Sequence, residues 1–177
     1  MNKNVYALED CIEDNSPSIF LAGPTPRDHS APSWRPEVIQ KLRDLKYEGD
    51  IFIPEKRGDY LSYEYGSHTE WEVKYLNRAT VILFWIPRNL DTMPAFTTNI
   101  EFGEFMHSGK IVLGYPDWAE KMRYLKIRAE MHNIPVHHTI EDTVKCAIDR
   151  SELLHLNIVN YKGANILALT ERQIDNL

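Results

Sequence analysis

Short apolar runs alternate along the chain with stretches in which apolar residues recur every three or four positions. The apolar runs cover residues 18–22, 50–53, 80–86, 110–115 and 134–137. Runs of this length, bounded by glycine or proline, are typical of β-strands, whereas the wider spacing indicates amphipathic helices. The regular alternation of the two patterns predicts an α/β domain with a parallel sheet.

Helices are expected between the predicted strands, and several have residues suited to capping. The expected ranges are 34–45, 69–78, 99–108, 117–132 and 140–156. Ser33 and Asn99 have the short polar side chains that accept hydrogen bonds from the first turn of a helix. Thr139 with Asp142 resembles a capping box before the last helix. Pro135 lies within the last strand, which predicts that this strand is at an edge of the sheet.

Five such β/α units fit a flavodoxin-like (Rossmann-like) three-layer sandwich better than a barrel, which needs eight. With the predicted strands numbered along the chain, we expect a five-stranded parallel sheet in the order 2-1-3-4-5. An open sheet of this kind binds ligands at the carboxyl ends of its strands, where the strand order reverses. Residues 23–27 and 87–101 should therefore lie on the rim of one crevice.

The size and composition of the chain predict a single soluble domain. We expect 177 residues to form one domain, with a core over about residues 18–156 and a tail over 157–177. No apolar run approaches the roughly 20 residues needed to cross a bilayer, so no membrane partner is expected. Only Cys11 and Cys146 are present, and the N-terminus lacks a signal-peptide pattern, which favours a cytoplasmic protein with reduced thiols.

The charge and the histidines restrict the ligands that we expect. The net charge of −6 argues against binding to nucleic acid, which depends on lysine and arginine, although a small nucleotide stays compatible. The glycine spacing in residues 23–26 fits neither a dinucleotide fingerprint nor a P-loop, so no cofactor is expected. His132, His137 and His138 lack a matching set of carboxylates or thiolates, and no metal site is expected either.

Glu101 is the first candidate for a catalytic residue. It follows the most apolar predicted strand and should lie in the first turn of a helix, where the helix dipole favours an ionised carboxylate. Thr97, Thr98 and Asn99 precede it and offer hydroxyl and amide groups suited to a sugar or phosphate. An ionised carboxylate in such a crevice can act as the nucleophile of glycosyl transfer. The alternative is a carboxylate that only stabilises the helix dipole.

Glycosyl transfer of this kind needs a second acid to assist the leaving group. Glu72, on the helix that leads into the third predicted strand, is the best candidate, because in a doubly wound fold this helix can overhang the first loop of the crevice. The alternative for Glu72 is a solvent-facing carboxylate paired with Lys74 or Arg78. The tyrosine-rich stretch 55–67 is expected to be a loop, which either covers a pocket or packs on its own scaffold.

Three motifs together resemble those of the nucleoside 2-deoxyribosyltransferase family. They match in order and spacing over roughly residues 18–115 and read Ile19-Phe20-Leu21-Ala22-Gly23-Pro24, Trp71-Glu72 to Ala79, and Asn99-Ile100-Glu101-Phe102-Gly103 before Gly109-Lys110.

The resemblance implies that Glu101 attacks C1′ and forms a covalent deoxyribosyl intermediate. It implies that Glu72, where the family usually has aspartate, contacts the base and helps it to depart. Gly23 and Pro24 match the loop that shapes the base and sugar pocket. Family members are flavodoxin-like and typically homo-oligomeric, so the resemblance implies a homo-oligomer here too.

The resemblance implies N-glycosidic bond cleavage or transfer on a (deoxy)nucleoside or nucleotide, without a cofactor. Residues 85–88 look like those of a divergent branch, and Arg27 or Arg88 would bind a 5′-phosphate if the protein is a nucleoside 5′-monophosphate N-glycosidase. The family has another aspartate shortly before its nucleophile, where this chain has Thr97, Thr98 and Asn99. This departure leaves open a non-catalytic nucleotide-binding sensor. Cleavage of NAD at its nicotinamide ribosyl bond is a third possibility.

Overall fold

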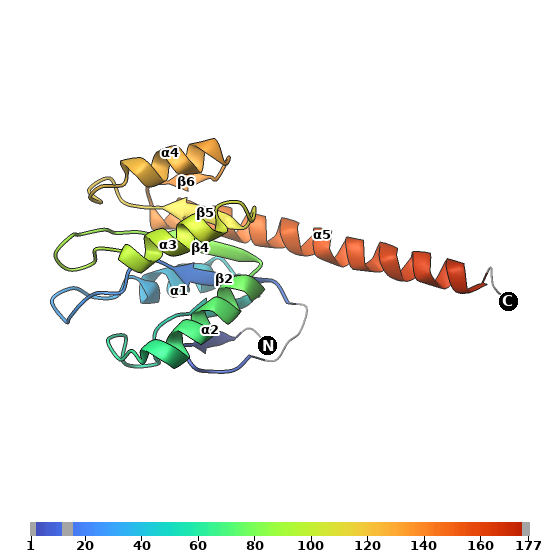
Figure 1. Cartoon of the computed structure of the whole chain (residues 1–177), viewed down its shortest axis with the longest axis horizontal. Helices are drawn as coiled ribbons and strands as arrows, with labels where there is room; N and C mark the ends of the chain where they lie inside the picture. The colour runs from blue at the N-terminus through green and yellow to red at the C-terminus, as the bar shows by residue number, and fades with distance from the viewer. Residues whose placement is uncertain (1–2, 12–15, 175–177) are drawn as a thin grey trace.

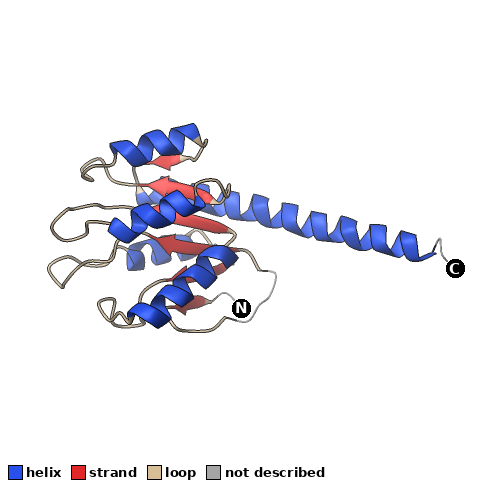
Figure 2. Ribbon diagram, viewed as in Figure 1, coloured by secondary structure: helices blue, strands red, loops and turns tan. Residues whose placement is uncertain are grey.

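The computed structural model shows one parallel sheet with helices on both of its faces (Figure 1; Figure 2). It describes residues 3–11 and 16–174, except for the side chains of residues 158–159 and 161–174. The strands are β1 (Asn4–Tyr6), β2 (Ser18–Ala22), β3 (Asp50–Ile53), β4 (Val81–Trp85), β5 (Ile111–Gly114) and β6 (Val136–His137). The helices are α1 (Arg35–Asp44), α2 (Tyr65–Arg78), α3 (Phe96–Phe105), α4 (Arg123–Met131) and α5 (Ile140–Ile174).

The sheet separates two hydrophobic cores, as expected for a three-layer sandwich. Every residue of β4 is buried, because alternate side chains point to opposite faces and helices cover both. Ile82 and Phe84 join the core beneath α2, α3 and α4. Val81 and Leu83 join the core beneath α1 and α5. The predicted α/β sandwich is therefore confirmed.

The strand order is β1-β3-β2-β4-β5-β6. The five predicted strands have the expected 2-1-3-4-5 arrangement, but the sheet has six strands, so the prediction of a five-stranded sheet was wrong. The additional strand β1 pairs in parallel with the outer edge of β3, with Val5 opposite Phe52. A strand of three residues on a sheet edge, with only Val5 fully buried, is too short to show a period in the sequence.

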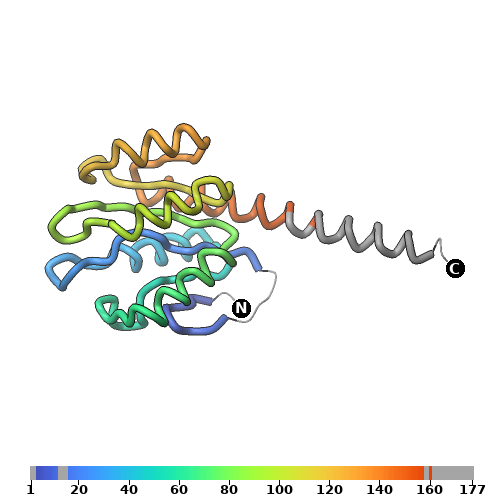
Figure 3. The backbone as a smooth tube through the Cα atoms, viewed as in Figure 1, coloured from blue at the N-terminus to red at the C-terminus, as the bar shows by residue number. Residues whose placement is uncertain are grey.

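The strand order reverses between β2 and β4, which are neighbours in the sheet. From β2 the chain passes through α1 to β3 on one side, and after β4 it continues to β5 and β6 on the other (Figure 3). The loops that follow β2 and β4 consequently diverge from one point on the carboxyl edge of the sheet. An open α/β sheet forms its ligand crevice at such a point.

Four helices differ from their predicted ranges by more than one residue. The helix α2 starts at Tyr65 rather than at residue 69, and α3 covers Phe96–Phe105 rather than residues 99–108, whereas α4 and α5 differ for identifiable local reasons. The prediction for residues 117–132 was too long, since α4 begins only at Arg123 after Lys121, whose φ of 54° is incompatible with a right-handed helix. The last helix continues through Ile174 instead of ending near residue 156. No proline interrupts residues 140–174, so the predicted tail is largely helical. Its final residues, 175–177, lie outside the described part of the chain.

Within the described part of the chain, every helix is either too short or too polar to pass through a lipid bilayer.

Candidate active site

A cavity of about 440 Å³ opens at the carboxyl ends of β2 and β4. Residues 22–27, 60–63 and 94–98 line it, together with the side chains of Arg35, Glu72 and Glu101. The first and last of these segments follow the two strands at which the order reverses. The middle segment belongs to the loop of residues 54–64 between β3 and α2, named here the tyrosine loop. Three loops distant in sequence thus enclose one space.

Glu101 lies in the second turn of α3, one turn later than predicted. The helix starts at Phe96 because Ala95 adopts a left-handed conformation with φ 63° and sets the N-terminal boundary. Thr98 and Glu101, three residues apart, share the face of α3 that lines the cavity. The stabilising effect of the helix dipole falls off within the first turn, so it contributes little at Glu101.

Glu72 comes from the middle of α2 and lines the same cavity as Glu101. We call these two residues the carboxylate pair. Glu72 Oε2 accepts a hydrogen bond of 3.1 Å from the Tyr63 hydroxyl. Of its predicted alternative partners, Arg78 donates to the Cys11 carbonyl at 3.3 Å. Lys74 forms an ion pair with Asp10.

Burial of both carboxyl groups raises their pKa values, and the charge of Glu72 also raises the pKa of Glu101. Burial raises the pKa of Glu101 to about 7, and the nearby Glu72 charge adds to this increase. Burial also raises the pKa of Glu72, against the opposing effects of the Tyr63 hydrogen bond and the Arg35 charge. The expectation that a helix terminus would favour an ionised Glu101 was therefore wrong, because desolvation dominates. Both carboxyl groups therefore hold their protons to higher pH than free glutamate does, a property suited to acid and nucleophile roles.

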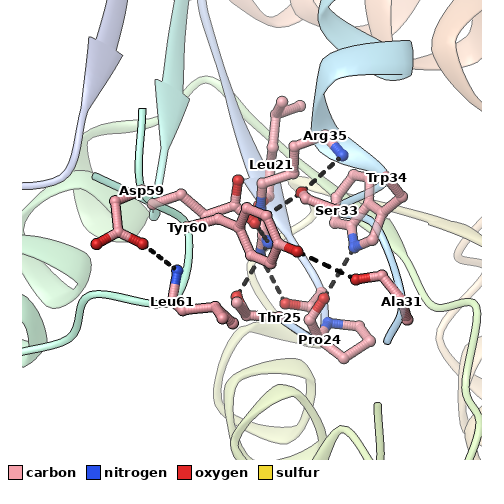
Figure 4. A network of polar contacts seen from close by, with 12 residues as sticks. Leu21, Pro24, Thr25, Ala31, Ser33, Trp34, Arg35, Asp59, Tyr60 and Leu61 are labelled. Atoms are coloured by element: carbon pink, nitrogen blue, oxygen red, sulfur yellow. Dashed lines mark hydrogen bonds and ion pairs between the residues drawn. The ribbon is translucent and has the colours of Figure 1, made fainter. Parts of the chain in front are cut away.

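Arg35 is a fully buried cation beside the carboxylate pair, with 1% of its surface exposed. Its guanidinium forms an ion pair of 2.6 Å with Glu55, which is also buried. It donates further hydrogen bonds to the carbonyl oxygens of Leu21 and Gly23 and to the Thr25 hydroxyl (Figure 4). Arg35 therefore fixes the loop after β2, and its charge lowers the pKa of each member of the pair.

Gly23 and Pro24 form the part of this loop nearest to β4. Gly23 has φ 147°, and a Cβ there would lie 2.2 Å from the Trp85 carbonyl oxygen, so no other residue fits without movement. The Pro24 carbonyl accepts a hydrogen bond of 2.9 Å from Trp34 Nε1 (Figure 4). Gly23 and Pro24 both line the cavity, and the contacts around them fix the course of this loop.

The tyrosine loop forms another part of the cavity wall. The Tyr60 hydroxyl donates to the Ala31 carbonyl at 3.2 Å, which ties the tyrosine loop to the segment after β2 (Figure 4). His29 Nδ1 lies 3.3 Å from the same hydroxyl. Tyr60 and Tyr63 both line the cavity, so this loop covers a pocket rather than packing only on its own scaffold.

The structure places the remaining predicted site residues in two groups. Arg27, Thr97 and Thr98 line the cavity, and Arg27 also donates to the Asp91 carbonyl at 3.2 Å. Asn99 and Arg88 are not among the lining residues, and they hydrogen-bond to each other instead. Asn99 follows Thr98 by about 100° around the helix, which turns its side chain away from the cavity.

Sequence analysis missed Arg35, Glu55 and Tyr63 as site residues. Arg35 stands at the start of an amphipathic helix, where an arginine is usually exposed, and nothing in the local pattern distinguishes it. Only Tyr63 had a signal, since it belongs to a tyrosine-rich stretch expected near a pocket. Among the described residues, no group of three or more histidines, cysteines or acids is placed to hold a metal ion.

A family model described as "Nucleoside 2-deoxyribosyltransferase like" matches residues 16–119, more than half of the chain. The matched segment includes all the residues that line the cavity. A comparison with curated proteins yields no match.

Proposed function

Since the chain belongs to the nucleoside 2-deoxyribosyltransferase-like family, we propose that it cleaves or transfers the N-glycosidic bond of a nucleoside or nucleotide. The observation that carries this proposal is the carboxylate pair, Glu72 and Glu101, with raised pKa values in one cavity. Non-catalytic binding gives little reason to desolvate two acids, whereas glycosyl transfer uses a pair of this kind.

In the proposed first step, a carboxylate oxygen of Glu101 attacks C1′ and forms a glycosyl ester. The electron pair of the broken C1′–N bond goes to the base nitrogen, which takes a proton from Glu72. In the second step a different base, or water, attacks C1′ and releases Glu101, while Glu72 accepts the proton of the incoming group. The pair thus acts as nucleophile and as acid–base catalyst in turn.

A nucleoside 5′-monophosphate is a second candidate substrate, and water would then resolve the ester. Arg27 supports this candidate, because it lines the cavity and is exposed enough to approach a phosphate. Arg88 does not support it, since its guanidinium already contacts Asn99 and the Lys121 carbonyl.

Incubation of the protein with deoxynucleosides, or their 5′-monophosphates, and a different free base tests the proposal. Chromatography should show base release, and formation of a new nucleoside would identify a transferase rather than a hydrolase. Glu101→Gln should lose at least a hundredfold in rate, because its amide is a poor nucleophile. Glu70→Gln, an exposed change on α2, is the matched control.

Intact-protein mass spectrometry addresses the proposed intermediate directly. Mixing with substrate should add the mass of one sugar unit to the protein, on the peptide that contains Glu101. Full activity of Glu101→Gln would contradict the mechanism, and tight nucleotide binding without any base release would indicate a sensor.

A further inference from the structure

Tyr63 is a polar neighbour of the carboxylate pair that the mechanism above does not use. Its hydroxyl donates to Glu72 Oε2 at 3.1 Å and lies 3.4 Å from Thr69 Oγ1. Its side chain lines the cavity, although 42% of its surface stays exposed. The hydrogen bond therefore joins the tyrosine loop to one of the two acids.

Contacts on the far side of Tyr63 hold the end of the tyrosine loop in place. His68 is fully buried, and its ring centroid lies 4.5 Å from that of Tyr63. The backbone N–H of Glu64 donates to His68 Nδ1 at 2.9 Å, and the Glu64 carboxylate forms an ion pair of 2.7 Å with Lys56. The contacts of His68 and Glu64 therefore hold Tyr63 in the position from which its hydroxyl donates to Glu72.

We propose that Tyr63 is a positioning residue for the reaction: its hydroxyl holds the Glu72 carboxyl at the cavity and leaves the shared proton of the pair with Glu101 until substrate binds. This inference rests on the proposed function of the pair. A donor to a carboxylate favours the ionised form, so Tyr63 makes Glu72 the stronger acid of the two.

The other charged groups around the pair either raise the pKa of Glu101 or lower the pKa values of both acids. Arg35 of α1 faces the pair and lowers the pKa of Glu72 and of Glu101. Glu104 of α3 raises the pKa of Glu101. Tyr63 acts on Glu72 by a direct hydrogen bond, which lowers the pKa of Glu72.

The position of the proton matters because the departing base needs one and the nucleophile must lose one. In the ligand-free protein Glu101 carries the proton, and a protonated carboxyl group is a poor nucleophile. When substrate binds, this proton passes to ionised Glu72, Glu101 becomes the nucleophile, and Glu72 delivers the same proton to the base nitrogen. The glycosidic electron pair ends on that nitrogen, so proton and charge balance within the pair and substrate.

Tyr63→Phe tests this role, because it removes the hydroxyl and keeps the ring that packs on His68. Carbon-13 NMR of the glutamate carboxyl groups, assigned with Glu72→Gln and Glu101→Gln, reports both pKa values in the ligand-free protein. We expect the pKa of Glu72 to rise by about 0.5 to 1, and the acid limb of the pH profile of kcat/KM to move upward equally. The alkaline limb should stay near pH 7, since burial sets the pKa of Glu101 there.

Tyr65→Phe is the matched control, because it removes a hydroxyl that also lines the cavity but makes no contact with Glu72 among the hydrogen bonds of the described residues. It should leave both carboxyl titrations unchanged. An unchanged Glu72 titration in Tyr63→Phe would overturn the inference. The NMR titration needs no substrate, so it decides the role of Tyr63 even if Glu101→Gln shows that the proposed function is wrong.

Discussion

Glu101 illustrates how burial, rather than position on a helix, decides the protonation of a catalytic candidate. The proposed mechanism needs one proton on the carboxylate pair, since Glu101 must be ionised and Glu72 protonated. In the proposed arrangement the proton of the pair lies on Glu101, whose pKa is about 7, so above that pH the departing base has no proton donor. Two coupled acids lose their protons in two steps that belong to the pair.

We therefore expect a bell-shaped pH profile of kcat/KM, with an alkaline limb near pH 7 that Glu101 sets. Glu72→Gln should lower the rate by about a hundredfold and remove the alkaline limb, because no general acid remains to be deprotonated. Steady-state kinetics between pH 5 and pH 9 measure both effects. Glu70→Gln, on the same helix, serves as control, and an alkaline limb that persists in Glu72→Gln would contradict the assignment.

The raised pKa of Glu101 also affects stability. A carboxyl group whose pKa is higher in the folded state favours folding while protonated, below the unfolded value of about 4.5, and this contribution is lost as the pH rises to about 7. Glu101→Gln avoids this loss. We expect it to be more stable than the wild type by roughly 2 kcal/mol at pH 8, and by little at pH 4.5.

Urea denaturation at the two pH values measures the difference. Glu70→Gln replaces an exposed carboxylate on α2 and should show no such pH dependence. If Glu101→Gln raises the free energy of unfolding equally at both pH values, a change in packing rather than in ionisation accounts for the effect.

At the scale of elements, Arg35 connects α1 with the loops that follow β2 and β3. Replacing it by methionine leaves Glu55 buried without its cation, a change that typically costs about 3 kcal/mol or more. We expect Arg35→Met to lower the free energy of unfolding by this amount, and Arg35→Met/Glu55→Gln to recover part of it.

Lys41→Met provides the comparison, because Lys41 forms an exposed ion pair of 3.5 Å with Glu141 on another helix. Exposed pairs contribute less than about 1 kcal/mol. A similar loss in both single variants, measured by urea denaturation, would show that the buried pair has no special role.

At the scale of the whole molecule, α3 exposes apolar side chains next to the cavity. Phe96 is 68% exposed and Ile100 is 71% exposed. Family resemblance led us to expect a homo-oligomer, and such a surface suits a contact between subunits. Ile100→Glu should then lower the molar mass measured by light scattering. Ile127→Glu on α4 is the control, and a monomeric wild type at micromolar concentration would contradict the expectation.

The order of the strands and most of the cavity rim followed from the sequence alone. Strand and helix periods are local properties, and the rules for connecting parallel strands leave few topologies, so residues 18–22 and 80–86 could be placed side by side. The motif around Glu101 and Glu72 was equally local, since each lies at a recognisable distance from a predicted strand. The sequence pattern did not predict the short strand β1, because three residues are too few to show a hydrophobic period.

Only the tertiary structure decided which side chains meet at the cavity and in what protonation state. Arg35 and Glu55 belong to different β/α units, and no local pattern marks either as buried. Because α3 starts at Phe96, Thr98 lies on the same face of the helix as Glu101. The next residue, Asn99, lies on another face and hydrogen-bonds to Arg88. A pKa depends on the solvent and charge around a group, which come from segments distant in sequence. The sequence therefore determined the candidates, and folding determined their environment.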